Sequence, residues 1–371
     1  MSFPPIPVPF RISARLSHAA LAFAVLIQPA VSATYTVNNA PDFNSLPRLN
    51  AGDVVQLNSG TYGAINKTLE SSISDDTTAK NNPILIYAVT PGGVVVNAPS
   101  QITLSGRGIT LAGLDFSANS GIPASSSYLI GTASGSRYMT LSHLRFSGCS
   151  AGNTDGKWIY IQGFYATVEY CTLTERPDTI RNATIAFLPN TAEGGVTVPR
   201  LHKVRYCYFG PRYAVPQDVN SDTDNGFESL RIGVGDVQTF DMQVTVERNV
   251  FYRSIWRTDG ATAGEPEIIS IKSKGNKILN NTILESQGSI CFRSGTGSTV
   301  EGNFIFGGGY YTNGTNIALG TASDNQGGIR VIGSDHIVRN NYIANIVGNG
   351  IRASLCVMSG ESDYYAGDPA N

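Results

Sequence analysis

The sequence predicts an all-β protein, folded as a single-domain right-handed parallel β-helix, and three observations support this prediction. The composition favours turns, because 40 of the 371 residues are glycine and only 15% are charged. No long segment is rich in the Lys, Glu and Leu that helices prefer. One short apolar motif also recurs along most of the chain. Short strands joined by turns, with a coil-length repeat, are typical of a β-solenoid.

The first 33 residues have the pattern of a secretory signal peptide. Two arginines precede an apolar run from Ala19 to Ile27, and small residues lead to Ala33. The alternative is a membrane anchor, but this run is shorter than the ~20 apolar residues of a membrane span. We therefore expect cleavage after Ala33 and a secreted protein, extracellular or periplasmic, in which residues 34–371 form the mature domain.

The mature chain begins with short strand-like pieces separated by turns. These pieces are Tyr35–Val37, Asp53–Leu57 and Ile84–Ala88. A solenoid needs a cap at each end, because its terminal strands expose unpaired edges and apolar core. We expect the region up to about residue 100 to supply the N-terminal cap.

The repeat that defines the fold begins after residue 100. Each copy has an apolar residue, a second key position three residues later and another apolar residue after five. The interval between copies varies, which suits a coil of constant inner course with outer loops of variable length. The eight copies are Leu111/Leu114/Phe116, Leu141/Leu144/Phe146, Val168/Cys171/Leu173, Val204/Cys207/Phe209, Val246/Asn249/Phe251, Ile278/Asn281/Ile283, Val300/Asn303/Ile305 and Val338/Asn341/Ile343.

Asparagine occupies the middle position in the last four copies, from Asn249 to Asn341. Its amide both donates and accepts hydrogen bonds, so copies stacked one coil apart can form a ladder inside a turn. Cys171 and Cys207 hold the same position in earlier copies, where stacked inert thiols are expected. A β-propeller is the rival fold, but its hairpins would need regular Asn-Gly or Asp-Gly turns, which are sparse here.

The overall charge excludes several classes of partner. A net charge of −2 gives no basic surface for nucleic acid, and no run of charge indicates a membrane surface. The five cysteines are too few and too irregularly spaced for a disulfide framework or a zinc site. We expect a monomer without nucleic-acid or membrane partners, and any polyanionic partner must be bound by a local cluster of charge.

Residues 265–293 contain such a cluster. Glu265 and Glu267 have the two-residue spacing that places both carboxylates on one face of a strand. Lys272 lies six residues before the anchor Ile278, and Arg293 lies seven before the next anchor, Val300. Lys272 and Arg293 should therefore be neighbours on adjacent coils. Glu267 and Lys272 have opposite strand parity, so a bend or bulge between them is needed if both face one groove.

This set of groups suits the removal of a proton next to the carboxylate of a uronic acid. Ca²⁺ held by Glu265, Glu267 and the amide oxygen of Asn225 would stabilise the charge that builds up on that carboxylate. Lys272 would act as the base, and Arg293 would stabilise charge or help to protonate the leaving oxygen. The alternative is a set of ordinary surface charges that form salt bridges between coils.

Four segments carry a family resemblance: GEPEIISIKS, NNTILESQGSICFRSG, STVEGNFIFGGG and GGIRVIGSDHIVRNNYI. They are similar to polysaccharide lyase family 6, the alginate lyases and chondroitinase B. The similarity is strong over residues 225–345 and thin over the rest of the mature chain. It implies a parallel β-helix, calcium-assisted β-elimination and an anionic uronate polymer as substrate, with alginate preferred.

Position by position, the resemblance implies a role for each charged residue of the cluster. Lys272 matches the base of the family and Arg293 matches its acid. Glu265 and Glu267 match calcium ligands, and Asn225, in NGFESLRIG, resembles the third ligand.

Two arginines are candidates for substrate binding, and the sequence departs from the family in three places. Arg330, in GGIR, resembles a substrate-binding arginine of the alginate-cleaving branch, and Arg231 is the second candidate. Ser294 stands where the family usually has a histidine, and Trp256–Ala263 resembles an insertion. We also expect the C-terminal coils of the family to be missing beyond Asn371.

Three other functions stay open beside an alginate lyase. One is a chondroitin or dermatan sulfate lyase of the same family. Another is a pectin-degrading type of glycoside hydrolase on the same fold, which would need two or three clustered Asp residues beside a His, and the sequence shows none. The last is a non-catalytic β-helix that binds polysaccharide, which the serine at position 294 keeps open.

Overall fold

The computed structural model describes residues 32–358 except 151, 153–155, 178–181, 190–194, 196, 215–226, 235–238, 255, 258–266, 308–309, 313–314, 318–325, 347, 349 and 351–352. Almost all of the predicted signal peptide therefore lies outside the described residues. So do Asn225, Glu265 and most of the predicted insertion at 256–263. Among the described residues, no helix is long and apolar enough to cross a membrane.

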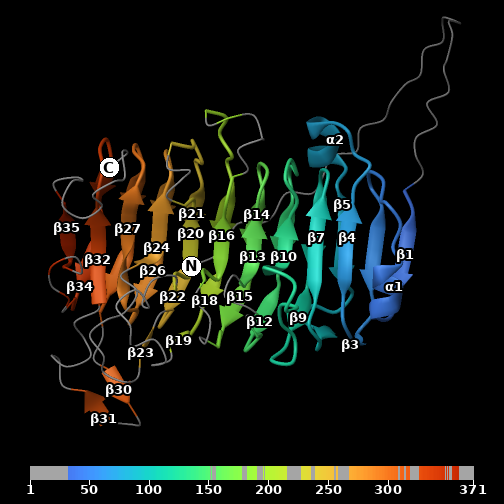
Figure 1. Ribbon diagram of the computed structural model, residues 1–371, viewed down its shortest axis with the longest axis horizontal. Helices are drawn as coiled ribbons and strands as arrows, with labels where there is room; N and C mark the ends of the chain where they lie inside the picture. The colour runs from blue at the N-terminus through green and yellow to red at the C-terminus, as the bar shows by residue number, and fades with distance from the viewer. Residues whose placement is uncertain are drawn as a thin grey trace, which may run out of the picture. The chain divides into compact units, whose positions relative to one another are not determined.

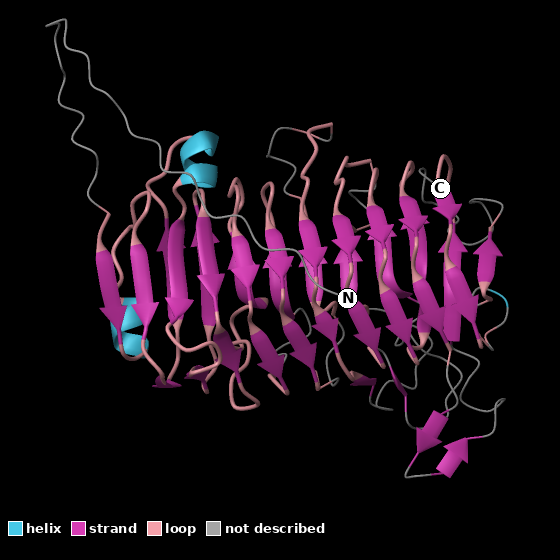
Figure 2. Cartoon of the chain, turned by 180° about the vertical axis from the view of Figure 1, so that it is seen from behind, coloured by secondary structure: helices cyan, strands magenta, loops and turns pink. Residues whose placement is uncertain are grey.

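Three long parallel sheets form the structure, and the chain visits them in turn, so that each circuit of three strands is one coil (Figure 1). Seen from behind, the strands of successive coils lie side by side in the same order (Figure 2). Every strand pair in these sheets is parallel. The predicted all-β fold, a parallel β-helix, is confirmed.

The first sheet has 11 strands in the described chain, namely β1 (Thr34–Val37), β2 (Val54–Leu57), β5 (Ile84–Ala88), β8 (Ile109–Ala112), β11 (Thr140–Ser142), β14 (Thr167–Glu169), β17 (Lys203–Arg205), β21 (Thr245–Glu247), β25 (Lys277–Leu279), β28 (Thr299–Glu301) and β33 (Ile337–Arg339). The second has 10 described strands, namely β3 (Gly60–Tyr62), β6 (Val94–Val96), β9 (Leu114–Phe116), β12 (Arg145–Ser147), β15 (Thr172–Thr174), β18 (Tyr208–Phe209), β22 (Val250–Tyr252), β26 (Thr282–Leu284), β29 (Phe304–Phe306) and β34 (Tyr342–Ala344).

The third sheet also has 10 described strands, namely β4 (Asn66–Glu70), β7 (Gln101–Ser105), β10 (Tyr128–Thr132), β13 (Lys157–Ile161), β16 (Ile185–Phe187), β20 (Leu230–Ile232), β24 (Glu267–Lys272), β27 (Gly288–Ser294), β32 (Gln326–Val331) and β35 (Leu355–Val357). Two smaller pairs lie between second-sheet and third-sheet strands in the chain, namely β19 (Tyr213–Ala214) with β23 (Trp256–Arg257) and β30 (Tyr310–Thr312) with β31 (Thr315–Ile317). The α-helices among the described residues are α1 (Ala40–Asn44) and α2 (Asp76–Asn81).

The repeat found in the sequence is the register of the coils. In the first sheet, Leu111 pairs with Leu141, and the pairing continues through every predicted anchor to Val338. In the second sheet, Phe116 pairs with Phe146, and the pairing continues in the same way to Ile343. The anchors up to Val300 in the first sheet and Ile305 in the second point into the buried core between the sheets. The sequence periodicity therefore identified the inward face correctly.

The predicted asparagine ladder lies at the turn between the first and second sheets. Asn281 Oδ1 accepts hydrogen bonds from the backbone N and the Nδ2 of Asn249, at 3.0 and 2.9 Å. Its own Nδ2 donates to the Val246 carbonyl and to Asn303 Oδ1, both at 3.0 Å. Asn303 repeats the pattern with Asn341. Each amide thus satisfies backbone groups that the tight turn leaves unpaired.

The residue before each ladder position has a left-handed backbone. Asn280 has φ of 54°, and Tyr170 and Tyr206, at the same place in earlier coils, have φ of 53° and 55°. Glycine fills the place in two coils, as Gly113 and Gly302, because it adopts this conformation without steric cost. The constant geometry explains why the three-residue spacing of the repeat is preserved.

The expectation of a separate N-terminal cap up to residue 100 is wrong in part. Strands β1, β2 and β5 are the first members of the first sheet, so the coils begin at residue 34. Val55 and Ile86 align with the anchor Leu111. The longer turn at Pro91–Gly93 separates Ile86 from the next strand, which removes the three-residue spacing and hides the repeat in the sequence.

We predict that Asn281→Ala destabilises the protein by about 2–4 kcal/mol, because the change leaves the buried N–H of Asn249 and carbonyl of Val246 without partners. Denaturant unfolding would measure the loss. Asn66→Ala is the matched control, since this exposed asparagine at the start of β4 is far from the ladder, and its effect should stay within about 0.5 kcal/mol. Equal stabilities for the two variants would contradict a structural role for the ladder.

Candidate functional site

The predicted charged residues that the structure describes lie on the third sheet, on the side that faces away from the core. Ile269 and Ile271 of β24 point into the core, so Ser270 between them points outward. Strand pairing places Ser270 in one row with outward residues of the neighbouring strands. We call this row the outer row, and its members are Arg231, Ser270, Cys291 and Arg330.

A bulge in β24 brings Glu267 and Lys272 to the same side. Strict alternation would put these residues on opposite faces. The register with β27 shifts between Glu267 and Ile269 and again between Ile271 and Lys272. Ile268 packs into the core next to Ile269, so the first shift turns Glu267 outward. The irregularity that the sequence required is therefore at Ile268.

Arg293 is the extra residue at the second shift. Ile271 pairs with Phe292, and Lys272 pairs with Ser294, so Arg293 stands between two paired positions of β27. Phe292 belongs to the core, and Arg293 therefore points outward. Lys272 and Arg293 lie on adjacent strands one residue apart in register, as the spacing from their anchors predicts.

Glu267 and Arg293 form an ion pair that is largely removed from water. Arg293 Nη1 donates to Glu267 Oε1 at 2.5 Å, and the Glu267 side chain is 0% exposed. Burial by itself would raise the pKa of Glu267, but the positive charges of Arg293 and Lys272 outweigh burial and hold this pKa below its ordinary value. Glu267 is therefore ionised at neutral pH. Such a buried pair differs from the exposed salt bridges of the alternative interpretation.

Lys272 lies beside a carboxylate that the sequence analysis missed. Lys272 Nζ is 4.0 Å from Glu228 Oε1, and the two side chains are 16% and 1% exposed. Glu228 precedes Leu230 by two residues, as Glu267 precedes Ile269, and Leu230 pairs with Ile269. Aligning the third-sheet strands would have revealed this equivalence. The repeat used for the prediction is anchored in the other two sheets.

The two arginines predicted to bind substrate occupy the outer row on either side of Ser270. Arg330 is 0% exposed and pairs in register with Cys291. Arg231 Nη2 donates to Asn182 Oδ1 at 2.8 Å. The sequence analysis gave Cys291 no functional role, and burial raises the pKa of its thiol. Its place between Ser270 and Arg330 puts it inside the candidate site.

Only one of the three predicted calcium ligands can be examined, because Asn225 and Glu265 lie outside the described residues. Within the described chain, no three His, Cys, Asp or Glu side chains gather as a metal site. Glu267 Oε2 is buried and accepts no hydrogen bond from the described residues. Ca²⁺ prefers such carboxylate oxygens. Glu267 therefore has an oxygen that fits a calcium ion.

Ser294 is the departure from the family that lies nearest to the candidate base. It pairs in register with Lys272 and is 4% exposed. Its hydroxyl is buried and has no hydrogen-bond partner among the described residues. The short side chain thus leaves the position beside Arg293 without an imidazole.

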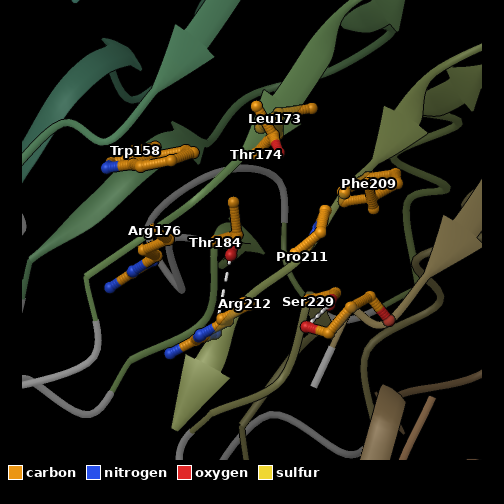
Figure 3. A pocket seen from close by; sticks show the side chains of 11 residues that line it. Trp158, Leu173, Thr174, Arg176, Thr184, Phe209, Pro211, Arg212 and Ser229 are labelled. Atoms are coloured by element: carbon orange, nitrogen blue, oxygen red, sulfur yellow. Dashed lines mark hydrogen bonds between the residues drawn. The ribbon is translucent and has the colours of Figure 1, made fainter. Parts of the chain in front are cut away.

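A small polar pocket lies beside the start of β20, and Figure 3 shows it from close by. Arg176 and Arg212 both project along it. Arg176 donates to the carbonyls of Gly156 and Ala183, and Arg212 donates to the carbonyls of Phe227 and Glu228. Both guanidinium groups thus bind backbone. Arg212 in this pocket therefore supports the backbone at Glu228.

The described residues of the site combine two ionisable carboxylates with four basic side chains. The carboxylates are those of Glu228 and Glu267, and the basic residues are Arg231, Lys272, Arg293 and Arg330. An excess of positive charge at a partly dehydrated surface attracts anions. A lysine beside an arginine can also transfer a proton and stabilise the charge that develops.

Comparison with known proteins assigns the chain to a family. The profile of the Chondroitinase B family matches residues 37–366. No curated protein matches the sequence in a direct search. Among solved structures, the PL6 family alginate lyase AlyGC is 26% identical with a TM-score of 0.68. The match covers 88% of this chain and 40% of AlyGC, so the chain spans two fifths of the length of that enzyme.

Two further solved structures share the fold. A mannuronic acid specific family 6 lyase from human gut microbiota is 21% identical, with a TM-score of 0.64 over 87% of this chain and 66% of that protein. The PL6 family polysaccharide lyase Pedsa3628 from Pseudopedobacter saltans is 24% identical, with a TM-score of 0.61 over 83% of this chain and 63% of that protein. With a profile match over most of its length, the chain belongs to polysaccharide lyase family 6, in the family described as Chondroitinase B.

Proposed function

We propose that this chain is a secreted polysaccharide lyase that cleaves alginate by calcium-assisted β-elimination. The observation that carries the proposal is the position of Lys272 next to Arg293 on the outward side of the third sheet, beside the buried carboxylate of Glu267. Alginate carries a carboxylate on each sugar, and the excess of basic side chains suits such a polymer. The 26% identity to the alginate lyase AlyGC supports this substrate over other uronates.

Lys272 would take the proton from the ring carbon next to the substrate carboxylate. The electron pair of that C–H bond forms a carbon–carbon double bond, and the bond to the glycosidic oxygen breaks. Arg293 would donate a hydrogen bond to this leaving oxygen and stabilise its charge. The leaving oxygen takes one proton from water, and Lys272 later releases one proton to water, so protons balance. The product is an unsaturated uronate.

Calcium would neutralise the substrate carboxylate and so make the neighbouring proton easier to remove. Glu267 would hold the ion through its unpaired oxygen, together with Glu265 and Asn225. Arg330 and Arg231, in the outer row, would bind carboxylates of neighbouring sugars. Position 294 is a serine, so no imidazole would bind the substrate there.

The match to the Chondroitinase B profile favours a second candidate substrate, chondroitin or dermatan sulfate. These polymers also contain uronic acids and would undergo the same elimination. A non-catalytic β-helix would bind polysaccharide without forming a double bond. Incubating the folded protein with each polymer and Ca²⁺, and following the ultraviolet absorbance of the unsaturated uronate, separates these functions.

We predict that Lys272→Ala lowers kcat on alginate by at least about 10²-fold, because the variant lacks the base. The ultraviolet assay gives the rate, and circular dichroism checks the fold. Lys277→Ala is the matched control, since Lys277 is exposed on β25 of the first sheet, and it should keep wild-type turnover. A Lys272→Ala enzyme as fast as the control would rule out the assignment of the base.

Removal of calcium should abolish turnover reversibly. We expect a chelator to stop the reaction, and excess Ca²⁺ to restore it, because the ion neutralises the substrate carboxylate. Ca²⁺ should also raise the Tm of the wild type by binding only the folded state. Glu267→Gln should weaken that rise, since the change removes a ligand charge. Unchanged turnover in chelator, or an equal rise in Tm for Glu267→Gln, would refute the metal assignment.

A further inference from the structure

We infer that Glu228 is a positioning residue that holds the side chain of Lys272 in place for proton transfer. The inference rests on the proposed function, because it assumes that Lys272 is the base. Glu228 is almost fully buried, and neither of its carboxylate oxygens accepts a hydrogen bond from the described residues. Lys272 Nζ lies 4.0 Å from Glu228 Oε1, and this ion-pair contact helps to compensate the buried negative charge.

The pair Glu228 and Lys272 repeats the register of the pair Glu267 and Arg293 one coil earlier. Leu230 pairs with Ile269, and Ile269 pairs with Ile290. In each pair, the carboxylate stands two residues before one of these paired positions. The cation stands three residues after the partner position on the next coil. The fold thus uses one arrangement twice, with a carboxylate from the preceding coil beside each proposed catalytic cation.

The backbone of Glu228 is fixed from several sides. Arg212 Nη1 donates to the carbonyls of Phe227 and Glu228 at 2.6 and 2.9 Å. The backbone N of Thr184 also donates to the Glu228 carbonyl, at 3.0 Å. Figure 3 shows Arg212 projecting toward Thr184 in the pocket beside the start of β20. A carboxylate on so constrained a backbone can restrict a flexible neighbour.

A lysine base needs such a neighbour more than an arginine does. Four rotatable bonds separate the Lys272 ammonium from its backbone, and its charge is a point without a fixed direction. Glu267 Oε1 already accepts a hydrogen bond from Arg293 Nη1. Glu228 therefore provides a second carboxylate, which restrains Lys272. The Glu228 carboxylate lies 4.0 Å from the Lys272 amine, without a hydrogen bond. It therefore restrains the amine and leaves the protons of the amine free to exchange.

The test compares wild type with Glu228→Gln, which keeps the shape and removes the charge. We expect kcat on alginate to fall by about 10²-fold, the effect of misplacing a catalytic group by ~1 Å. KM and the Ca²⁺ concentration for half-maximal activity should stay within about 3-fold, because Glu228 is inferred to act through Lys272 alone. Glu228→Asp, which restores the charge, should recover part of kcat. Glu169→Gln removes a carboxylate from an ion pair with Arg205 on the first sheet and should match wild type.

Two outcomes would overturn the inference. Wild-type kcat in Glu228→Gln would show that Lys272 needs no anchor. A large loss of calcium affinity, measured by calorimetry, would make Glu228 a ligand of the ion instead.

A crystal structure of Glu228→Gln tests the inference independently of the proposed function. We expect the Lys272 side chain to leave its wild-type rotamer when the charge is removed. Unchanged Lys272 coordinates would contradict positioning, whether or not the wild type is a lyase. No turnover of any uronate by wild type would refute the proposed function alone.

Discussion

The parallel register of the coils is the constraint on which the candidate site depends. In a parallel β-helix, residues at equivalent places on successive coils lie one strand spacing apart, ~4.8 Å. The asparagine ladder and the stacked apolar anchors fix that register, since a slip of one residue would turn the anchors out of the core. Because the register is fixed, Lys272 and Arg293 are neighbours although 21 residues separate them in sequence.

The site itself is built where the register is locally broken. The two shifts between β24 and β27 turn Glu267 outward and insert Arg293 beside Lys272. Bulges of this kind redirect side chains without disturbing the rest of a sheet. The redirected charges are mostly buried and paired across coils, with Glu228 beside Lys272 and Glu267 bonded to Arg293. Burial strengthens these electrostatic interactions and fixes the side chains before a substrate binds.

The sequence predicts the parts of the fold that repeat and misses the parts that vary. The repeats from Leu111 to Val338 could be aligned in the sequence because a left-handed residue keeps the turn between the first and second sheets at constant length. The coils before residue 100 could not, because the turn at Pro91–Gly93 changes that length. The need for a bulge followed from strand parity, but its place at Ile268 depends on packing in the core. Glu228 was missed because its spacing from the next anchor differs: 16 residues lie from Leu230 to Val246, but 9 from the paired Ile269 to Ile278.

A crystal structure of the Lys272→Ala variant with Ca²⁺ and an alginate oligosaccharide tests the central claim most directly. If Lys272 and Arg293 form the catalytic pair, a uronate will lie over the outer row. Its carbon next to the carboxylate will face position 272, and its glycosidic oxygen will lie within hydrogen-bond reach of Arg293. An oligosaccharide bound to the first or second sheet, or a uronate that turns this carbon away from position 272, would contradict the account.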